Sequence, residues 1–299
     1  MHKNICILLS THNGELFLEE LVSSLRSQTN QQFDLLCLDD ASTDGTLALL
    51  EKLNIHYNQN NDNKGIKYNI NKLLKIAVNQ LQYDYFMFCD QDDIWNTNKI
   101  EITLQKMKKI EKESPDLPIL LHSDLEVVDK DLRTIEESFW HFANLNPSCN
   151  AFHRLLMQNT ITGCTVMINR KLAELALPIS NDVIMHDWWL GLVASKFGKI
   201  AYINEALVRY RQHGKNSIGA VKFNILKKYR ESIDFEKHIK QAKVFLTQYR
   251  SYLSKNSIRM LEDFTQIESQ SYWQKRRILL KHKLLKQGFL RNLGLLLKI

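Results

Sequence analysis

The stretch FCDQDDIW, at positions 88–95, places Asp90, Asp92 and Asp93 directly after the apolar run YFMFC (85–89). Carboxylates this close repel one another, and at the end of a strand each raises the pKa of its neighbours. The apolar run has the composition of a buried parallel strand. Because a bound cation would relieve the repulsion, the stretch predicts a cation-binding site at this strand end.

The segments before this stretch alternate between strand-like and helix-like patterns. Short apolar runs predict strands, and apolar residues that recur every three or four positions predict helices. The predicted strands are ICILL (5–9), DLLCL (34–38), NIHYN (54–58) and YFMFC (85–89), and the predicted helices cover 15–28, 41–53 and 66–81. This alternation predicts an α/β fold with a mainly parallel sheet covered by helices.

Polar residues gather where three of the predicted strands end. The first strand leads into STHNGE (10–15), the second into Asp39 and Asp40, and the fourth into DQDD (90–93). Ligands of such sheets bind beyond the carboxyl ends of the strands. One acidic strand end has an ordinary explanation as a helix cap or a turn, but three on one edge predict a site.

The rest of the chain is less regular. The predicted elements are strands at 118–129 and 162–170, a helix at 186–198, an extended hairpin or pair of strands at 199–214, and helices after Gly219. We therefore expect two domains, an α/β domain at 1–219 and a helical, basic C-terminal extension at 220–299. Neither an internal repeat nor a low-complexity linker is found in the sequence.

The net charge of +7 is concentrated at the C-terminal end. Positions 271–299 hold eight of the 40 Lys and Arg residues and no acid, which leaves 32 basic against 33 acidic residues in the first 270 positions. A nucleic-acid enzyme would spread basic charge around its site, so we expect no nucleic-acid partner. A basic, Leu-rich tail favours peripheral contact with an acidic membrane surface, and a packing or dimerising helix pair is the alternative.

Two further features bear on location. No apolar run reaches the ~18 residues of a membrane span, and the first residues do not form a signal peptide. The five cysteines include no C-x-x-C pair, which argues against a zinc site or a disulfide framework and favours a reducing compartment. We expect a cytoplasmic protein associated with the inner face of the membrane.

The chemistry of the strand ends is narrowed by what the sequence does not contain. Neither G-x-G-x-x-G nor G-x-x-x-x-G-K-[ST] is present, so phosphates are not expected to bind in a glycine-rich loop. A divalent cation held by carboxylates is the alternative, and Mg²⁺ or Mn²⁺ suits hard oxygen ligands and phosphates.

Four segments together resemble the family 2 glycosyltransferases with the GT-A fold. They are ILLSTHNGELFL (7–18), LCLDDASTDGT (36–46), FCDQDDIW (88–95) and HDWWL (186–190). With YRQHG (210–214), the combination is most similar to the rhamnosyltransferase-type branch. The resemblance covers about residues 1–219 and implies inverting transfer of a sugar, with dTDP-rhamnose the favoured donor, to a hydroxyl of a saccharide or lipid-linked saccharide.

The resemblance also implies roles for individual residues. The implied nucleotide-sugar contacts are Thr11, Asn13, Glu15, Asp39, Asp40 and Asp90. Asp90 and Asp92 are the ends of the D-x-D motif and would hold Mg²⁺ or Mn²⁺, with His213 as a further metal or diphosphate contact. Asp187 would be the general base that deprotonates the acceptor hydroxyl, and His186 and Trp188 would contact the acceptor. Asp93 is expected to be a structural or helix-leading acid.

Some of these residues also have structural explanations, and two depart from the family pattern. Asp187 could cap the helix that begins there, and Trp189 lies on the apolar face of that helix. His122 and Asp124 could border the site or form a surface turn. His12 stands where the family often has an aromatic residue, and His186 replaces the Glu of a Glu-Asp pair, so that its charge would affect the base.

Two other functions remain open from the sequence. A nucleotidyltransferase, or another enzyme of nucleotide-diphosphate sugars, could use the same acidic edge but would not need Asp187. A non-catalytic subunit that binds nucleotide sugars would bind nucleotide with metal and show no turnover with any acceptor. Metal-dependent transfer from an activated donor is the leading interpretation, because one metal and one base suffice for it.

Overall fold

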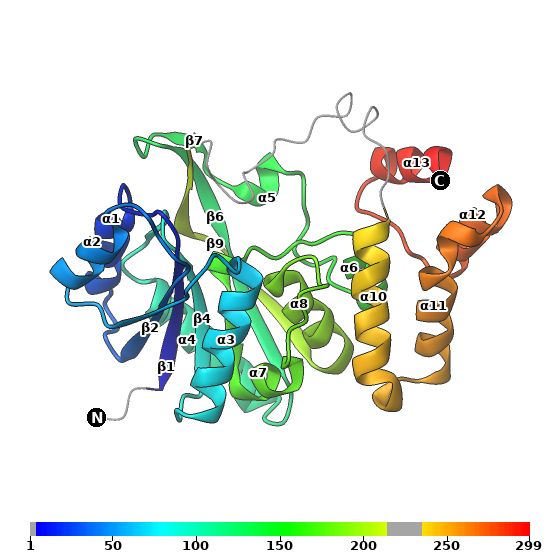
Figure 1. Cartoon of the computed structure of the whole chain (residues 1–299). Helices are drawn as coiled ribbons and strands as arrows, with labels where there is room; N and C mark the ends of the chain where they lie inside the picture. The colour runs from blue at the N-terminus through cyan, green and yellow to red at the C-terminus, as the bar shows by residue number, and fades with distance from the viewer. Residues whose placement is uncertain (1–3, 214–234) are drawn as a thin grey trace.

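The computed structural model describes residues 4–213 and 235–299 (Figure 1). The domain boundary expected between positions 219 and 220 lies outside the described residues. The strands are β1 (Ile5–Thr11), β2 (Phe33–Asp39), β3 (Tyr57–Gln59), β4 (Tyr85–Asp90), β5 (Ile94–Trp95), β6 (Ile119–Asp129), β7 (Thr134–Glu136), β8 (Met167–Asn169) and β9 (Lys199–Gln212). They form one sheet in the order β3-β2-β1-β4-β8-β6-β9-β5, and β7 pairs with β6.

The two halves of the sheet differ in direction. Strands β1 to β4 pair in parallel, as the alternating pattern predicts. Beyond β4 the sheet is mixed, because β8 runs antiparallel to both β4 and β6 while β6 and β9 are parallel. The expected parallel architecture therefore holds for the N-terminal half, which carries the predicted site.

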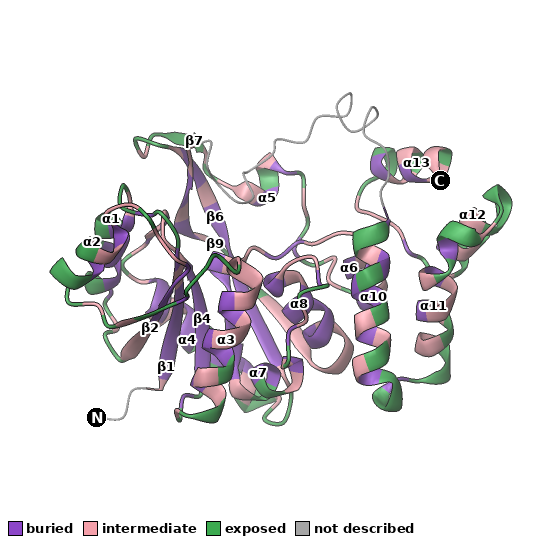
Figure 2. Cartoon of the chain, viewed as in Figure 1, coloured by how far each residue is buried: buried purple, intermediate pink, exposed green. Residues whose placement is uncertain are grey.

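Helices cover both faces of the sheet. The helices of the α/β part are α1 (Leu18–Arg26), α2 (Thr46–Lys52), α3 (Ile66–Asn79), α4 (Lys99–Glu113), α5 (Phe139–Phe142), α6 (Phe152–Leu155), α7 (Arg170–Ala176) and α8 (His186–Phe197). One core cluster joins the sheet to α3, α7 and α8, and a second joins its other face to α1, α2 and α4 (Figure 2). Alternate residues of each strand point to opposite faces, so the fully apolar runs are buried on both sides.

The prediction of a hairpin or two strands at 199–214 is wrong, because the structure has a single strand, β9. The register with β6 pairs Ser123 with Ile203 and then Asp124 with Ala206. Asn204 and Glu205 are thus left out of the pairing in an irregularity of the ladder, as in a β-bulge. The polar break in the sequence marks this bulge and not a turn.

Residues 235–299 are mainly helical, as predicted, and the predicted helical residues 220–234 lie outside the described residues. The helices are α10 (Glu236–Tyr249), α11 (Lys255–Thr265), α12 (Tyr272–Lys281) and α13 (Phe289–Lys298). Helix α10 packs on α8, where the ring centroids of Phe245 and Trp189 are 5.6 Å apart, and on α6, where those of Phe245 and Phe152 are 4.8 Å apart. The extension therefore shares the core of the α/β part. No helix within 4–213 or 235–299 is long and apolar enough to span a membrane.

Candidate active site

The carboxyl ends of β1, β2 and β4 lie next to one another at one edge of the sheet. The chain enters β1 from below in Figure 1, so these ends point upward. The register pairs Thr11 of β1 with Asp39 of β2, and Ser10 of β1 with Asp90 of β4. The three polar clusters of the sequence therefore meet at one edge, as the parallel order predicts.

Asp39 is fully buried and accepts hydrogen bonds from residues of the two adjoining loops. Its Oδ2 accepts hydrogen bonds from Thr11 Oγ1 at 2.8 Å and from Ser42 Oγ at 2.6 Å, and its Oδ1 accepts one from the Ser42 N–H at 2.9 Å. These bonds fix the turn between β2 and α2 against the end of β1. Thr11 and Asp39 thus hold the two loops in place, and nucleotide contact by either stays a prediction.

Asn13 and Glu15 connect the loop after β1 to the loop after β2. Asn13 Oδ1 accepts a hydrogen bond from the Thr43 N–H at 2.8 Å, and Glu15 Oε2 accepts one from the Gly45 N–H at 2.6 Å. Gly45 immediately precedes α2, so Glu15 places a carboxylate where a helix start favours negative charge. Both side chains are exposed, and a ligand at the sheet edge could reach them.

Asp40 organises the loop that leads into α3. Its Oδ1 accepts hydrogen bonds from Asn60 Nδ2 at 2.8 Å and from the Lys64 N–H at 2.9 Å, and its Oδ2 accepts one from the Gly65 N–H at 2.7 Å. Burial alone would raise the pKa of Asp40, but these hydrogen bonds outweigh it and lower the pKa. Asp40 is therefore an ionised, buried residue that shapes the loop, and its contact with a base stays a prediction.

Gln91, between the two acids of the D-x-D motif, joins β4 to the loop after β1. Its Oε1 accepts a hydrogen bond from the His12 N–H at 2.8 Å, and its Nε2 donates one to the His12 carbonyl at 2.9 Å. A Cβ at Gly14 would lie only 2.4 Å from Gln91 Oε1, so a glycine allows this close approach. The sequence pattern did not single out Gln91.

Asp90 and Asp92 stand at the end of β4 with His213 beside them. His213 Nε2 lies 2.7 Å from Asp92 Oδ2, although the two residues are far apart in the sequence. Burial, together with the charges of Asp92 and Asp187, raises the pKa of Asp90 to about 7. The structure thus places His213 against Asp92, and Asp92 close enough to Asp90 to raise its pKa, but it does not bring ligand atoms of all three residues within 4.8 Å of one another. Metal binding by the three stays a prediction.

Asp93 is fully buried behind this edge, in keeping with the structural role expected of it. Its Oδ1 accepts a hydrogen bond from the Arg211 N–H at 3.2 Å, and burial with the neighbouring acids raises its pKa well above the ordinary value. Ligand atoms of Asp90, Asp93 and Cys164 lie within 4.8 Å of one another. Thiolate is a soft ligand, whereas Mg²⁺ and Mn²⁺ prefer oxygen, so we do not assign Cys164 as a ligand of either ion.

Arg211 fastens the D-x-D turn to its surroundings. Its Nε donates a hydrogen bond to the Asp92 carbonyl at 3.0 Å, its Nη1 donates one to the Lys130 carbonyl at 2.7 Å, and its Nη2 pairs with Glu20. The guanidinium also lies 4.6 Å from the ring centroid of Phe17. Only 2% of Arg211 is exposed, so this is a buried clamp on the site and not a surface charge.

Asp187 begins α8 and is oriented by three donors. Its Oδ1 accepts a hydrogen bond from the Trp188 N–H at 2.6 Å, and Asn159 Nδ2 lies 3.4 Å from its Oδ2. Burial raises the pKa of Asp187 to about 6, although hydrogen bonds from Trp188, Gly163 and Asn159 lower it in part. Such a carboxylate is largely ionised at pH 7 and more basic than an exposed one, which suits a general base.

The residues next to Asp187 on α8 differ in burial and in their contacts. His186 is buried with its ring centroid 5.4 Å from that of Phe88, and burial lowers its pKa to about 4, so it is neutral at pH 7. Trp188 is half-buried and donates from Nε1 to the Leu155 carbonyl. Trp189 is fully buried in the core, as its place on the apolar face predicts. Contact of His186 or Trp188 with an acceptor stays a prediction.

His122 and Asp124 do not form a surface turn, because both are buried within β6. Asp124 Oδ2 accepts a hydrogen bond from Ser138 Oγ, and the ring centroid of His122 lies 5.6 Å from that of Trp140.

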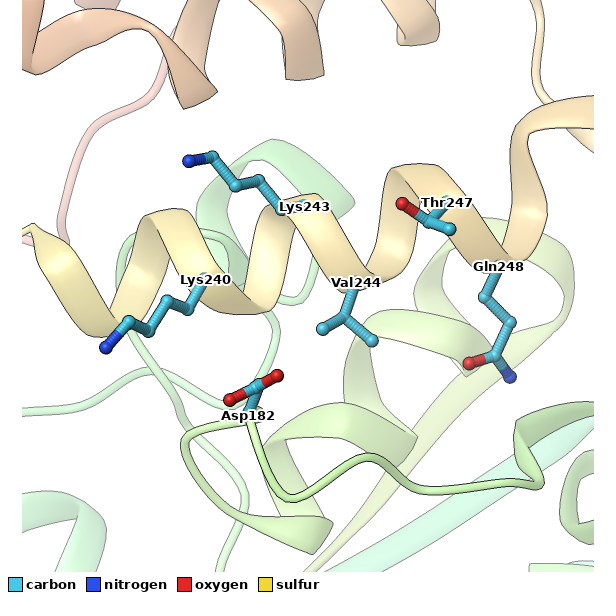
Figure 3. A pocket seen from close by; sticks show the side chains of 6 residues that line it. All are labelled: Asp182, Lys240, Lys243, Val244, Thr247 and Gln248. Carbon is cyan, nitrogen blue, oxygen red and sulfur yellow. The ribbon is translucent and has the colours of Figure 1, made fainter.

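A separate hollow of about 390 Å³ lies beside α10 (Figure 3) and is lined by Asp182, Lys240, Lys243, Val244, Thr247 and Gln248. It contains none of the residues predicted for the site.

The model of the family described as "Glycosyl transferase family 2" matches residues 6–175. The chain belongs to glycosyltransferase family 2. It is 27% identical over 71% of its length, and 74% of the relative's, to the dTDP-rhamnosyl transferase RfbG of Shigella flexneri. It is also 30% identical over 76% of its length, and 87% of the relative's, to the putative teichuronic acid biosynthesis glycosyltransferase TuaG of Bacillus subtilis.

Solved structures show that this glycosyltransferase has the GT-A fold. Residues 1–349 of S. aureus TarS in complex with UDP-GlcNAc align with a TM-score of 0.53 at 18% identity, over 94% of this chain and 80% of that one. The chain spans only 43% of a longer TarS structure. The mannosyltransferase PcManGT from Pyrobaculum calidifontis, in complex with GDP-Man and Mn²⁺, aligns with a TM-score of 0.52 at 13% identity, over 99% of this chain and 79% of that one.

Three positioning residues of this glycosyltransferase escaped the sequence interpretation. Gln91 carried no signal beyond its place inside the D-x-D motif, and Asn159 carried none at all. Arg211 lies two residues before His213 in a strand whose sequence predicts a hairpin or a pair of strands. Each acts through contacts with residues distant in the sequence, so local patterns could not reveal them.

Proposed function

We propose that this enzyme is an inverting, metal-dependent glycosyltransferase that moves rhamnose from dTDP-rhamnose to a saccharide hydroxyl in the synthesis of a bacterial surface polysaccharide. The observation that carries the proposal is the closeness of two distant acids. His186, the residue before Asp187 in α8, packs on Phe88 of β4 with ring centroids 5.4 Å apart, and the charge of Asp187 contributes to the raised pKa of Asp90 at the end of β4. This arrangement supports a site in which the predicted donor-binding edge and the predicted base adjoin each other.

The residues present fit a divalent cation. Asp90 and Asp92 offer hard carboxylate oxygens, and the mutual repulsion that raises the pKa of Asp90 would be relieved by positive charge. His213, next to Asp92, would complete the ligand set or contact the diphosphate. Mg²⁺ or Mn²⁺ bound there would stabilise the negative charge of the departing diphosphate. The Mn²⁺ in the PcManGT structure supports the choice of ion.

Asp187 performs the proton transfer in this proposal. The acceptor hydroxyl gives its proton to Asp187 as its oxygen forms a bond to the anomeric carbon, and the bond from that carbon to the diphosphate breaks. The nucleoside diphosphate leaves with the bonding electron pair, and attack from the face opposite to it inverts the anomeric centre. Asn159 and the Trp188 N–H hold the carboxylate in one orientation for this step.

The remaining predicted residues surround the donor and the acceptor. Asn13, Glu15 and Asp40 lie in or against the loops that would enclose the nucleotide, and Thr11 and Asp39 tie two of those loops together. His186 and Trp188 adjoin the base and would face the acceptor. Because His186 is neutral at pH 7, it would not lower the basicity of Asp187 by adding positive charge.

The donor and the acceptor rest on names of relatives. RfbG is named as a dTDP-rhamnosyl transferase, and another relative, WfgD of Escherichia coli, is named as a glucosyltransferase for a diphosphoundecaprenol-linked sugar. We extend the proposal to a saccharide or lipid-linked saccharide acceptor, and to work at the cytoplasmic face of the membrane. No nucleic-acid partner belongs to this proposal.

A thermal-shift panel tests the donor and the metal together. The protein is heated with dTDP-rhamnose, UDP-glucose, UDP-GlcNAc or GDP-mannose, each with and without Mn²⁺. A shift for dTDP-rhamnose alone, and only with Mn²⁺, is expected. A shift for another donor would replace the sugar assignment, and a shift that ignores Mn²⁺ would contradict the metal assignment. Turnover that survives Asp187→Asn would favour a nucleotidyltransferase over sugar transfer to a hydroxyl.

A further inference from the structure

The last two helices expose most of the large apolar side chains found on the described surface. Among residues 4–213 and 235–299, twelve large hydrophobic residues are exposed, and seven of them lie between positions 272 and 297. These seven, here called the apolar patch, are Tyr272, Trp273, Leu280, Phe289, Leu290, Leu293 and Leu297. Trp273 is 76% exposed and Phe289 is 79% exposed. Exposure of several large apolar side chains to water is unfavourable and marks an interaction surface.

Helix α13 has two distinct faces. Phe289, Leu293 and Leu297 recur every four positions and are exposed, whereas Arg291 and Leu295 are buried. Side chains four positions apart share one face of a helix, so the outer face of α13 is apolar along its length. The helix therefore has two apolar faces, one packed on the core and one exposed on the surface.

Helix α13 and the turn before it are fixed to the α/β part. Arg291 donates from Nη1 to the Asn144 carbonyl and from Nη2 to the Ala143 carbonyl, both at 2.6 Å. The Gln287 N–H donates to Gln158 Oε1 at 2.8 Å, next in the chain to Asn159, which contacts Asp187. The outer face of α13 thus has a defined position relative to the site, and α13 lies toward the same upper side as the carboxyl ends of the strands in Figure 1.

The charge around the apolar patch is mainly positive, although Asp263 of α11 pairs with Lys281 and His282. Positions 271–299 contain eight Lys and Arg residues and no acid. Of these, Arg277, Lys281 and Lys283 are exposed, and Lys281 pairs with Asp263. The Arg276 guanidinium lies 3.2 Å from the ring centroid of Tyr272. Two copies of the chain joined through this surface would bring like charges together, which disfavours a dimer. An anionic lipid surface meets both the apolar and the basic side chains.

We propose that α12 and α13 form an interfacial docking surface that rests on an anionic lipid bilayer. Trp273 and Phe289 would enter the headgroup region with the leucines of the apolar patch, while Arg277 and Lys283 would meet lipid phosphates. The proposal deepens the proposed function by naming a partner surface for an enzyme with a lipid-linked acceptor. Docking would hold the site at a fixed height and tilt over the bilayer.

Vesicle flotation tests the surface without the reaction. The full chain is mixed with vesicles of phosphatidylcholine alone or of phosphatidylcholine and phosphatidylglycerol in equal parts, and the bound fraction is measured. Binding is expected only with phosphatidylglycerol. Phe289→Ser with Leu293→Ser should reduce the partition coefficient about tenfold or more, because two exposed apolar side chains no longer leave water on docking. Leu117→Ser with Ile135→Ser, exposed elsewhere, is the matched control and should bind as wild type.

A charge-reversed pair tests the electrostatic part. Arg277→Glu with Lys283→Glu should reduce binding by at least about 30-fold, since each basic residue near an anionic surface contributes about 1 kcal/mol. Lys106→Glu with Lys109→Glu, exposed on α4, should leave binding unchanged. Full binding by both tail variants, or equal loss in the controls, would overturn the proposal.

Two further readouts separate this proposal from its rivals. The thermal shift with dTDP and Mn²⁺ should be the same in the tail variants and in wild type, so failure of docking and failure of the proposed donor site are distinct results. Sedimentation velocity measures self-association. A wild-type dimer that becomes a monomer in Phe289→Ser with Leu293→Ser, with no vesicle binding by either, would assign the surface to a second copy and overturn the lipid proposal.

Discussion

Replacing Asp187 with Asn should remove the proposed base while keeping the size of the side chain. General-base catalysis contributes about 10²- to 10⁴-fold to a rate, so kcat should fall by roughly that factor while the donor still binds. The assay is release of nucleoside diphosphate in the presence of acceptor. Donor binding followed by thermal shift shows that the site remains intact, since Asp187 is not among the proposed metal ligands.

The pH dependence gives the same prediction a magnitude. Burial raises the pKa of Asp187 to about 6 from an ordinary value of 3.8. A base must be deprotonated to act, so kcat/KM should rise with pH, by about tenfold between pH 5 and pH 7 for a pKa of about 6. A base with an ordinary pKa would change by only about a tenth over that range. The residual activity of Asp187→Asn should lack this rise, which separates Asp187 from Asp90.

The same substitution should increase the stability of the fold at pH 7, although it lowers activity. Because the folded-state pKa of Asp187 is raised, the fold favours its protonated form, and ionisation costs stability as the pH rises from about 4 to about 6. The difference from 3.8 corresponds to an upper bound of about 3 kcal/mol at pH 7. Asp187→Asn should therefore raise the unfolding midpoint at pH 7 and not at pH 3. A flat wild-type pH profile, or a variant that keeps kcat within threefold of wild type, would refute the assignment of the base.

Three other substitutions, the last with a matched control, test the rest of the site and its scaffold. Asp92→Asn should abolish the Mn²⁺-dependent part of the dTDP thermal shift, and an unchanged shift would contradict its role as a metal ligand. Arg211→Met should lower the free energy of unfolding, measured with urea, by about 2–4 kcal/mol, because the buried bond to the Asp92 carbonyl and its companions are lost. Gly198→Ala should destabilise by at least about 2 kcal/mol, since its Cβ would lie 1.9 Å from the Pro118 carbonyl oxygen, whereas Gly294→Ala has open space and should not.

Much of the site could be placed from the sequence because its parts sit at the ends of parallel strands. Parallel strands bring their carboxyl ends to one edge whatever lies between them, so chain order alone places Thr11, Asp39 and Asp90 together. The period of apolar residues likewise predicted the helices that cover the sheet. These are local signals, and a local signal is sufficient where the fold repeats one unit.

The sequence was misleading where the sheet departs from that repeating unit. The polar residues Asn204 and Glu205 resemble a turn. In the structure they form an irregularity of the β6–β9 ladder, and the chain continues beyond them as the same strand. A bulge and a turn use similar residue types, and only the partner strand decides between them. The same continuous strand carries Arg211 to the D-x-D turn.

The sequence by itself determined the α/β alternation, the acidic strand ends and the concentration of basic and apolar residues at the C-terminal end. Only the tertiary structure decided that His213 lies against Asp92, that Asn159 orients Asp187, and which faces of α12 and α13 remain exposed. The physical reason is the distance along the chain over which each effect acts. Propensity and periodicity act over a few residues, whereas the pKa of a base and the exposure of a helix face depend on neighbours brought in from distant parts of the chain.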